Sequence, residues 1–243
     1  MAIARETATT PEGLTELDGI HNAIWSRTLP VSESLHVYTR WSGTGVHAVD
    51  VKIVDRSTDT SLAESSDSLD FGDSPVTWFI HDFGSTSFPS AGTYAIEVAL
   101  DDQPAATYAL YVNAEEELPD QPAFVISVPA ERGLLDRRGD GKVTGIFEYF
   151  SVPSFPARET FAIVTVWFSG NGTLRHSADI RDAHGNLVAR SPSITLAATR
   201  GGMSIATNTF DSVEFPSAGT YTATVYLEGN KVLSYPVVIR QRK

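Results

Sequence analysis

Apolar and polar residues alternate along several short segments of the chain, and this is the pattern of β-strands with one buried face. Residues 35–41 (LHVYTRW) and 161–167 (FAIVTVW) place apolar side chains at every second position. Residues 93–100 and 220–227 alternate in the same way. Gly-, Asn- and Asp-rich turn signals separate such segments, and no segment keeps a helical period over ten residues. The pattern therefore predicts an all-β protein.

An internal repeat sets the domain organisation. The heptapeptide FPSAGTY at residues 88–94 recurs unchanged at residues 215–221, and matching residues continue on both sides of it. A repeat of this length has the size of a whole domain. The charged, proline-containing stretch 113–122 separates the copies. The sequence predicts two tandem domains, residues 1–117 and residues 118–243.

Each copy is expected to be an antiparallel β-sandwich of immunoglobulin-like character. The sequence Ala-Gly-Thr-Tyr leads directly into an alternating strand in both copies, which resembles the tyrosine corner of such sandwiches at Tyr94 and Tyr221. Trp41 and Trp167 lie on inward strand faces and are interpreted as buried core residues. A sugar-stacking platform is the alternative for these two tryptophans.

The second copy also resembles a known family. Its closing pattern FPSAGTY, TATVYLEGN and YPVVI, together with residues 141–147 (GKVTGIF) and 182–188 (DAHGNLV), is similar to small bacterial β-sandwich proteins in a family of unknown function. The resemblance covers most of residues 124–240. It implies the fold only and supplies no catalytic residues. The first copy departs from it at Glu16, which replaces Lys142, and at residues 56–70, interpreted as a Ser- and Asp-rich insertion.

The copies differ at their beginnings. The second opens with the apolar run Phe124–Val128, whose counterpart in the first would lie mostly before Met1. One interpretation is a shorter edge strand in the first copy. The other is an open sheet edge that a partner strand fills.

Charge is distributed unevenly along the 243 residues, whose net charge is −12. Residues 1–117 hold 19 acidic and 5 basic residues, a net charge of −14, whereas residues 118–243 are close to neutral at +2. Such an acidic chain is a poor binder of nucleic acid or anionic membranes. The second copy has a local basic cluster, Arg132, Arg137, Arg138 and Lys142. This cluster is the candidate interaction patch, with head-to-tail self-association as one possibility.

Catalytic and cofactor motifs are not found in the sequence. There is no cysteine, no G-x-S-x-G, no P-loop and no dinucleotide fingerprint. The six histidines show no metal-ligand spacing and are interpreted as surface residues. Residues 136–142 (DRRGDGK) lack a calcium-loop ligand pattern and predict a hairpin turn. We therefore expect no enzyme activity, no cofactor and no metal site.

The function predicted is a non-catalytic structural or protein-interaction module, such as a subunit or adaptor of a larger bacterial assembly. A carbohydrate- or peptide-binding accessory domain is the alternative, and an acid-based hydrolase is the least favoured class. Exposure of Trp25 or Trp78 along a groove would favour sugar binding. The N-terminus shows no apolar signal region, so a cytoplasmic location is expected, with signal-independent export left open.

Overall fold

The computed structural model describes residues 1–242 and consists almost wholly of β-strands, with one short 3-10 helix, η1 (Glu115–Glu117). Its residues group into two compact units. The first contains Met1–Thr7 and Leu17–Gln121, and the second contains Ala8–Glu16 and the chain from Pro122 onward. The prediction of an all-β chain with two tandem domains is confirmed.

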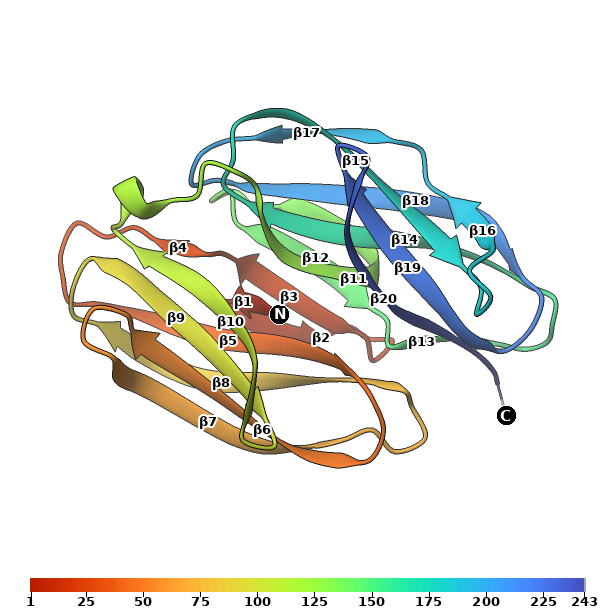
Figure 1. The fold of residues 1–243 in the computed structure, drawn as a ribbon, viewed down its shortest axis with the longest axis horizontal. Helices are drawn as coiled ribbons and strands as arrows, with labels where there is room; N and C mark the ends of the chain where they lie inside the picture. Colours follow the sequence, from red (N-terminus) through yellow and green to blue (C-terminus); the bar gives the residue numbers. More distant parts are fainter. Residues whose placement is uncertain (243) are drawn as a thin grey trace. The chain divides into compact units, whose positions relative to one another are not determined.

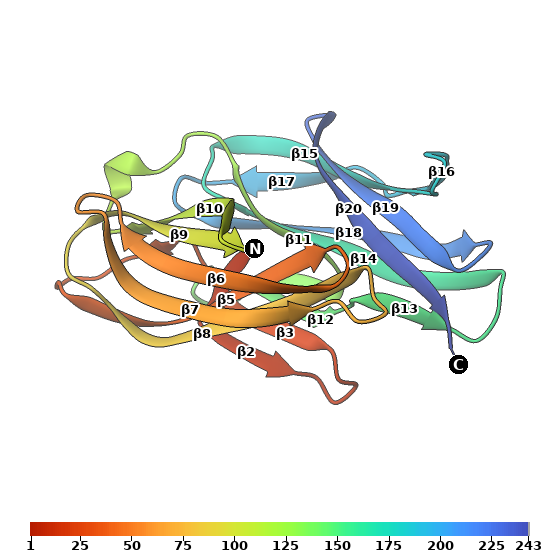
Figure 2. The same ribbon diagram turned by 60° about the horizontal axis from the view of Figure 1, so that its bottom comes forward.

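The first unit is a sandwich of two sheets, drawn in red to yellow-green in Figures 1 and 2. One sheet has three strands in the order β1-β5-β8, and the other has five in the order β4-β10-β9-β6-β7. Neighbouring strands are antiparallel, except that β4 runs parallel to β10. The strands are β1 (Ala2–Ala4), β4 (Ala23–Ile24), β5 (Val31–Ser42), β6 (Val46–Asp55), β7 (Thr60–Asp70), β8 (Val76–Phe88), β9 (Gly92–Leu100) and β10 (Gln103–Val112).

Alternation along the strands builds the core of this unit. Leu35 and Val37 of β5, and Val49, Val51 and Ile53 of β6, are fully buried in one cluster. Every second side chain of a strand points to the same face, so each of these strands presents an apolar row to the core.

The second unit repeats the plan with more strands. One six-stranded sheet has the order β18-β14-β11-β12-β3-β2, and the other six-stranded sheet has the order β13-β20-β19-β15-β16, with β17 also paired to β15. The strands of these two sheets are β2 (Glu6–Thr9), β3 (Thr15–Ile20), β11 (Ala123–Leu135), β12 (Gly141–Ile146), β13 (Tyr149–Val152), β14 (Ala157–Phe168), β15 (Gly172–Arg181), β16 (Leu187–Arg190), β17 (Ile194–Ala198), β18 (Met203–Phe215), β19 (Gly219–Leu227) and β20 (Asn230–Gln241). Of β2 and β3, only the residues within Ala8–Glu16 group with the second unit.

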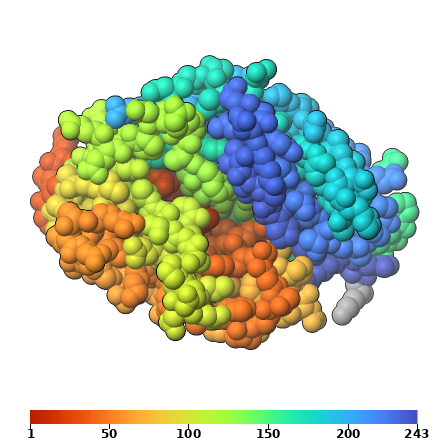
Figure 3. All heavy atoms as spheres, viewed as in Figure 1, coloured from red at the N-terminus to blue at the C-terminus, as the bar shows by residue number. Residues whose placement is uncertain are grey.

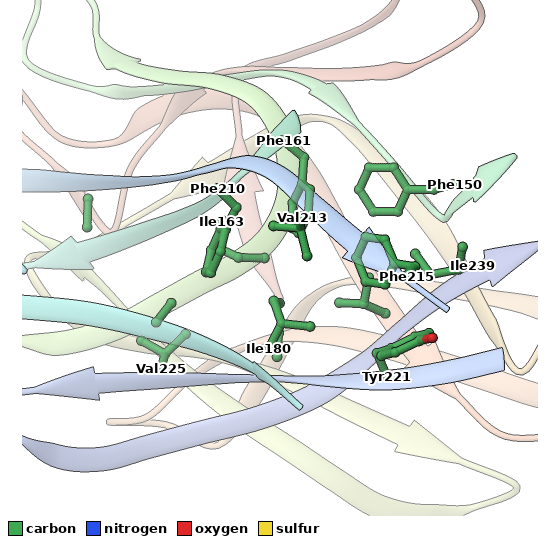
Figure 4. Packing of buried hydrophobic residues seen from close by; sticks show 14 of the residues in the cluster. Phe150, Phe161, Ile163, Ile180, Phe210, Val213, Phe215, Tyr221, Val225 and Ile239 are labelled. Atoms are coloured by element: carbon green, nitrogen blue, oxygen red, sulfur yellow. The ribbon is translucent and has the colours of Figure 1, made fainter. Parts of the chain in front are cut away.

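The core of the second unit combines aromatic rings with Ile and Val side chains (Figure 4). The Phe161 and Phe210 rings stack with their centroids 5.2 Å apart, and Phe215 meets the edge of Tyr221 at 4.9 Å. Paired rings in these geometries add to the stabilisation from burial alone.

Two segments differ from their sequence interpretation. Residues 56–70 are not an insertion, because β7 pairs with β6 from Thr60 to Asp70 and takes the place that β16 and β17 occupy in the second unit. The segment Ala8–Glu16, placed by sequence in the first domain, belongs to the second unit. There, β3 neighbours β12 in the sheet, and the Lys142 ammonium lies 2.6 Å from the Glu16 carboxylate.

Both predicted tyrosine corners are confirmed. The Tyr94 hydroxyl donates to the backbone oxygen of Ser90 at 2.9 Å, and the Tyr221 hydroxyl donates to that of Ser217 at 2.9 Å. Both tyrosines are buried. Each corner therefore ties the start of a strand to the turn before it.

Replacing Tyr94 or Tyr221 by Phe is expected to lower the free energy of unfolding by about 1 kcal/mol, because the buried tyrosine loses its hydrogen bond to the turn. Urea unfolding measures the change. Tyr149→Phe is the control, since Tyr149 is 39% exposed and a surface change there is expected to stay within about 0.5 kcal/mol. Equal losses in all three variants would show that the corner bonds contribute nothing specific.

Candidate functional site

The two repeats differ along one edge of their sheets. In the second unit, residues 123–130 of β11 pair with β14 from Phe168 back to Ala162. In the first unit, residues 2–4 of β1 are the only ones that pair with the corresponding edge of β5. The covering strand of the first repeat is therefore the shorter one.

The two ladders share one register. Ala2 lies opposite Tyr38 in the same way that Val128 lies opposite Val164. Residues 39–42 of β5 therefore correspond to residues 165–168 of β14, which β11 covers. On one side, residues 39–42 pair with β8. On the other side, no strand among residues 1–242 pairs with them.

A hollow of about 100 Å³ lies beside this open edge. Figures 1 and 2 both mark the N-terminus next to β10, and Met1 lies in the lining together with residues of β5, β9 and β10. Figure 3 shows the hairpin β9–β10 at the surface of the first unit, in yellow-green. The lining residues are Met1, Thr39, Arg40, Trp41, Val98, Ala105, Ala106 and Tyr108.

In the second unit, β11 fills the equivalent place. The Phe124 ring meets the edge of the Trp167 ring at a centroid distance of 5.8 Å. The Ser127 hydroxyl lies 2.9 Å from the Thr165 hydroxyl and 3.1 Å from the Tyr235 hydroxyl. An aromatic ring and a small hydroxyl thus complete this edge of the second sandwich.

In the first unit, the corresponding side chains lack these partners. Trp41 is only half-buried, and its indole N–H donates to the Thr39 hydroxyl at 2.9 Å. Ala106 stands where the second repeat has Leu233. Burial raises the pKa of Tyr108, whose hydroxyl has no hydrogen-bond partner within the described part of the chain. The core interpretation is thus confirmed for Trp167, at 3% exposed, and only half right for Trp41.

A family model matches the chain over residues 1–113 and 132–240, and its description is a family of unknown function (DUF6941). The chain belongs to this family. The two matched segments follow the two repeats, and the part of β11 before Arg132 lies between them. No curated protein matches the chain.

Solved structures show distant similarity to this member of the family. A crystal structure of CBD12 from CALX1.2 has 10% identity and a TM-score of 0.25, covering 85% of this chain and 77% of that one. Dimeric latent PorU from Porphyromonas gingivalis has 10% identity and a TM-score of 0.35, covering 100% of this chain and 20% of that one. The β-glucuronidase of Bifidobacterium dentium has 12% identity and a TM-score of 0.31, covering 86% and 39%.

The predicted basic patch lies on the hairpin β11–β12. Arg137 and Arg138 are exposed in its turn. Side chains two positions apart along a strand point to the same face. In the register that pairs β11 with β12, this places Arg132 on β11 and Lys142 on β12 on one face of the hairpin. Lys142 is paired with Glu16, so three of the four cations face solvent. The patch as an interaction surface stays a prediction.

The histidines are not all surface residues, as the sequence had suggested. His21, His81 and His176 are buried, and only His184 is fully exposed. His81 lies on β8 and His176 on β15, at buried positions. Burial is the main cause that lowers the pKa of His81, and it lowers the pKa of His176 to about 4. These rings act as core side chains. Within residues 1–242, no group of three or more His, Asp or Glu side chains is arranged to hold a metal ion.

One buried ionic cluster has no sequence signal. The carboxylate of Asp179 is fully buried and accepts hydrogen bonds from Arg181 at 2.9 Å, Arg190 at 3.0 Å and the Tyr226 hydroxyl at 3.2 Å. Burial raises the pKa of Asp179, but the bonds from Arg190 and Arg181 outweigh it and hold the pKa below its usual value. The donors come from β15, β16 and β19, so the cluster fastens the edge strand β16 to its sheet.

The remaining tryptophans lie away from the hollow. Trp25 is 52% exposed, and Trp78 stacks on Tyr38 with ring centroids 6.0 Å apart. Neither lines the hollow beside β5.

Across the described residues, no helix has the length and hydropathy needed to span a membrane.

Proposed function

We propose that this protein is a non-catalytic protein-interaction module that binds an extended segment of another protein at the open edge of β5. The observation that carries the proposal is the hollow beside β5, next to a side of residues 39–42 that no strand among residues 1–242 covers. An exposed strand edge presents backbone N–H and C=O groups that a further strand can pair with. Strand addition of this kind is a recurrent mode of peptide recognition.

The chemistry of the hollow supports binding rather than catalysis. Its lining combines aromatic, small apolar and hydroxyl side chains with the single guanidinium of Arg40. The Thr39 hydroxyl already accepts a hydrogen bond from Trp41. Apolar walls with a few polar groups are typical of sites that bind a side chain.

The duplication supports the same function. The second repeat carries a longer strand at the same edge, in a ladder that shifts register once, between Phe124 and Ile126. We propose that the corresponding edge of the first repeat receives its strand from a partner protein. This arrangement suits an adaptor or a subunit of a larger assembly.

Affinity capture from the native source with three forms of the full chain tests the proposal. The first is the wild type. The second, the edge-filled chain, carries Met1→Ser preceded by Ala-Phe-Val-Ile, so that the chain itself supplies the counterpart of residues 123–127. The third is Arg137→Glu/Arg138→Glu, which alters the basic patch and leaves β5 untouched. Mass spectrometry quantifies what each form retains.

The expected result is a protein retained by the wild type and by the charge-reversed form and lost from the edge-filled chain. Equal capture by the wild type and the edge-filled chain would overturn the proposal. Loss from the charge-reversed form alone would assign the interaction to Arg137 and Arg138 instead.

A further inference from the structure

We infer that the first repeat binds a free aromatic α-amino acid on the outer face of its five-stranded sheet. A hollow of about 250 Å³, which we term the outer hollow, lies over β6, β9 and β10. These strands lie side by side in Figures 1 and 2. Drug-sized ligands occupy pockets of about 300–1,000 Å³, so the outer hollow suits a smaller molecule. The site needs no strand at the edge of β5, and the inference is therefore independent of the proposed function.

The second repeat has an aromatic ring at the place of the outer hollow. Ala99 on β9 and Tyr226 on β19 hold equivalent positions, in ladders with β6 and β15 that contain no register shift. Lys52 and Asp179 are equivalent in the same ladders. The Tyr226 hydroxyl lies 3.2 Å from the Asp179 carboxylate, so the ring spans the distance between these two positions. Ala99 and Lys52 line the outer hollow. The change from tyrosine to alanine therefore leaves room for one ring.

Side chains of both charges line the outer hollow. Asp50 and Glu97 supply carboxylates, and Lys52, opposite Glu97 in the ladder of β6 with β9, supplies an ammonium group. The Asp50 carboxylate accepts a hydrogen bond from the Ser66 hydroxyl and has further lone pairs for a ligand. A ligand with one charge alone would meet a like charge here, which disfavours binding. A free α-amino acid has an ammonium group for the carboxylates and a carboxylate for Lys52.

The ion pairs that these side chains form with their neighbours are loose. The Lys52 ammonium lies 3.5 Å from the Glu64 carboxylate, and the Arg56 guanidinium lies 3.7 Å from the Glu97 carboxylate. The four side chains are between 42% and 54% exposed, and pairs between exposed side chains contribute little stability. The charges of a ligand can therefore join or replace these pairs at low cost.

The β10 side of the outer hollow is apolar at a position where the second repeat is charged. Both hairpins shift register once at this place, so Pro104 lies opposite Ala99 in the same way that Lys231 lies opposite Tyr226. Pro104 and Ala106 line the hollow together with Ala99. An aromatic ring in contact with these side chains removes apolar surface from water. An apolar wall next to groups of opposite charge thus selects an aromatic amino acid.

NMR titration of the isotope-labelled full chain with L-phenylalanine tests the inference. We expect the amides of residues 50, 52, 97 and 99 to shift, with a dissociation constant in the millimolar range. L-Alanine is expected to bind about tenfold more weakly, because it lacks the ring. N-acetyl-L-phenylalanine and L-phenylalanine methyl ester each lack one charge, and each is expected to bind about two- to fivefold more weakly. D-Glucose at the same concentrations is the probe for a hydroxylated ligand.

Three variants locate the ligand. Ala99→Tyr introduces the residue of the second repeat and is expected to abolish the shifts at residues 50 and 52. Ala183→Tyr is the control, because Ala183 is exposed in the turn after β15, and it is expected to bind as the wild type does. Lys52→Met is expected to lose the preference for L-phenylalanine over its methyl ester, because the group that distinguishes the two is gone. Shifts retained with both ligands show that this variant is folded.

No shift at these residues up to about 20 mM L-phenylalanine, a concentration that detects millimolar affinity, would show that the outer hollow takes no aromatic amino acid. Equal shifts in the wild type and in Ala99→Tyr would place the ligand elsewhere. Equal binding of L-phenylalanine and both analogues would show that its charges are not recognised. Shifts with D-glucose alone would assign the hollow to a hydroxylated ligand. Each of these results overturns the inference and leaves strand addition at β5 untouched.

Discussion

Replacing Trp167 by Ala is expected to lower the free energy of unfolding of the second unit by about 3–5 kcal/mol, the range for removing a large aromatic side chain from a core. The equivalent change in the first repeat, Trp41→Ala, is expected to cost that unit less than about 2 kcal/mol, because a half-buried side chain has less burial to lose.

The difference between the two tryptophans has a local cause. Trp167 is 3% exposed because Phe124 lies across it, whereas Trp41 borders the hollow. The cost of Trp41→Ala is therefore expected to rise in the edge-filled chain. Hydrogen exchange read by mass spectrometry on peptides from each unit separates their stabilities. Equal costs at both positions in the wild type would show that the missing strand leaves Trp41 no less well packed.

The sequence predicted the fold well because its two strongest signals are local. Alternation over residues 35–41 and 161–167 reports one buried face, and the repeated FPSAGTY heptapeptide marks a corner whose tyrosine hydrogen bond depends on residues only four positions apart. The shorter opening strand of the first repeat was also visible, since comparing the two copies needs no knowledge of contacts.

Features that depend on contacts far apart in the sequence were missed. Asp179 forms hydrogen bonds with Arg190 and Tyr226 across three strands, and no spacing along the chain predicts these contacts. Residues 56–70 look like an insertion because their Ser and Asp content hides a strand that pairs along its whole length with β6. His176 looked like a surface residue because one polar residue in an alternating strand does not reveal which face is buried.

Acidification is expected to destabilise the second unit between about pH 6.5 and about pH 4 through His176. The ring is fully buried beside Trp167, at a centroid distance of 5.9 Å. Burial lowers its pKa from 6.5 to about 4, and the Asn208 side chain opposes this shift only in part. The folded chain therefore holds the ring neutral over a pH range in which the unfolded chain protonates it.

The sign follows from proton linkage. Above pH 6.5 neither state binds the proton and the unit has its full stability. Below that value the unfolded state binds a proton that the folded state does not, so stability falls until the folded pKa near 4 is reached. A shift of this size corresponds to a loss of about 3 kcal/mol across the range.

The first repeat supplies the matched replacement for this histidine. Val49 lies opposite Leu100 as His176 lies opposite Leu227, and Val49 is fully buried. We expect His176→Val to remove most of the acid sensitivity of the second unit, measured by hydrogen exchange at pH 7.5, 5.5 and 4.5. His184→Asn is the control, since His184 is exposed in the turn after β15, and it is expected to keep the wild-type profile. Retention of the full acid sensitivity in His176→Val would show that another group, such as a carboxylate of the Asp179 cluster, controls it.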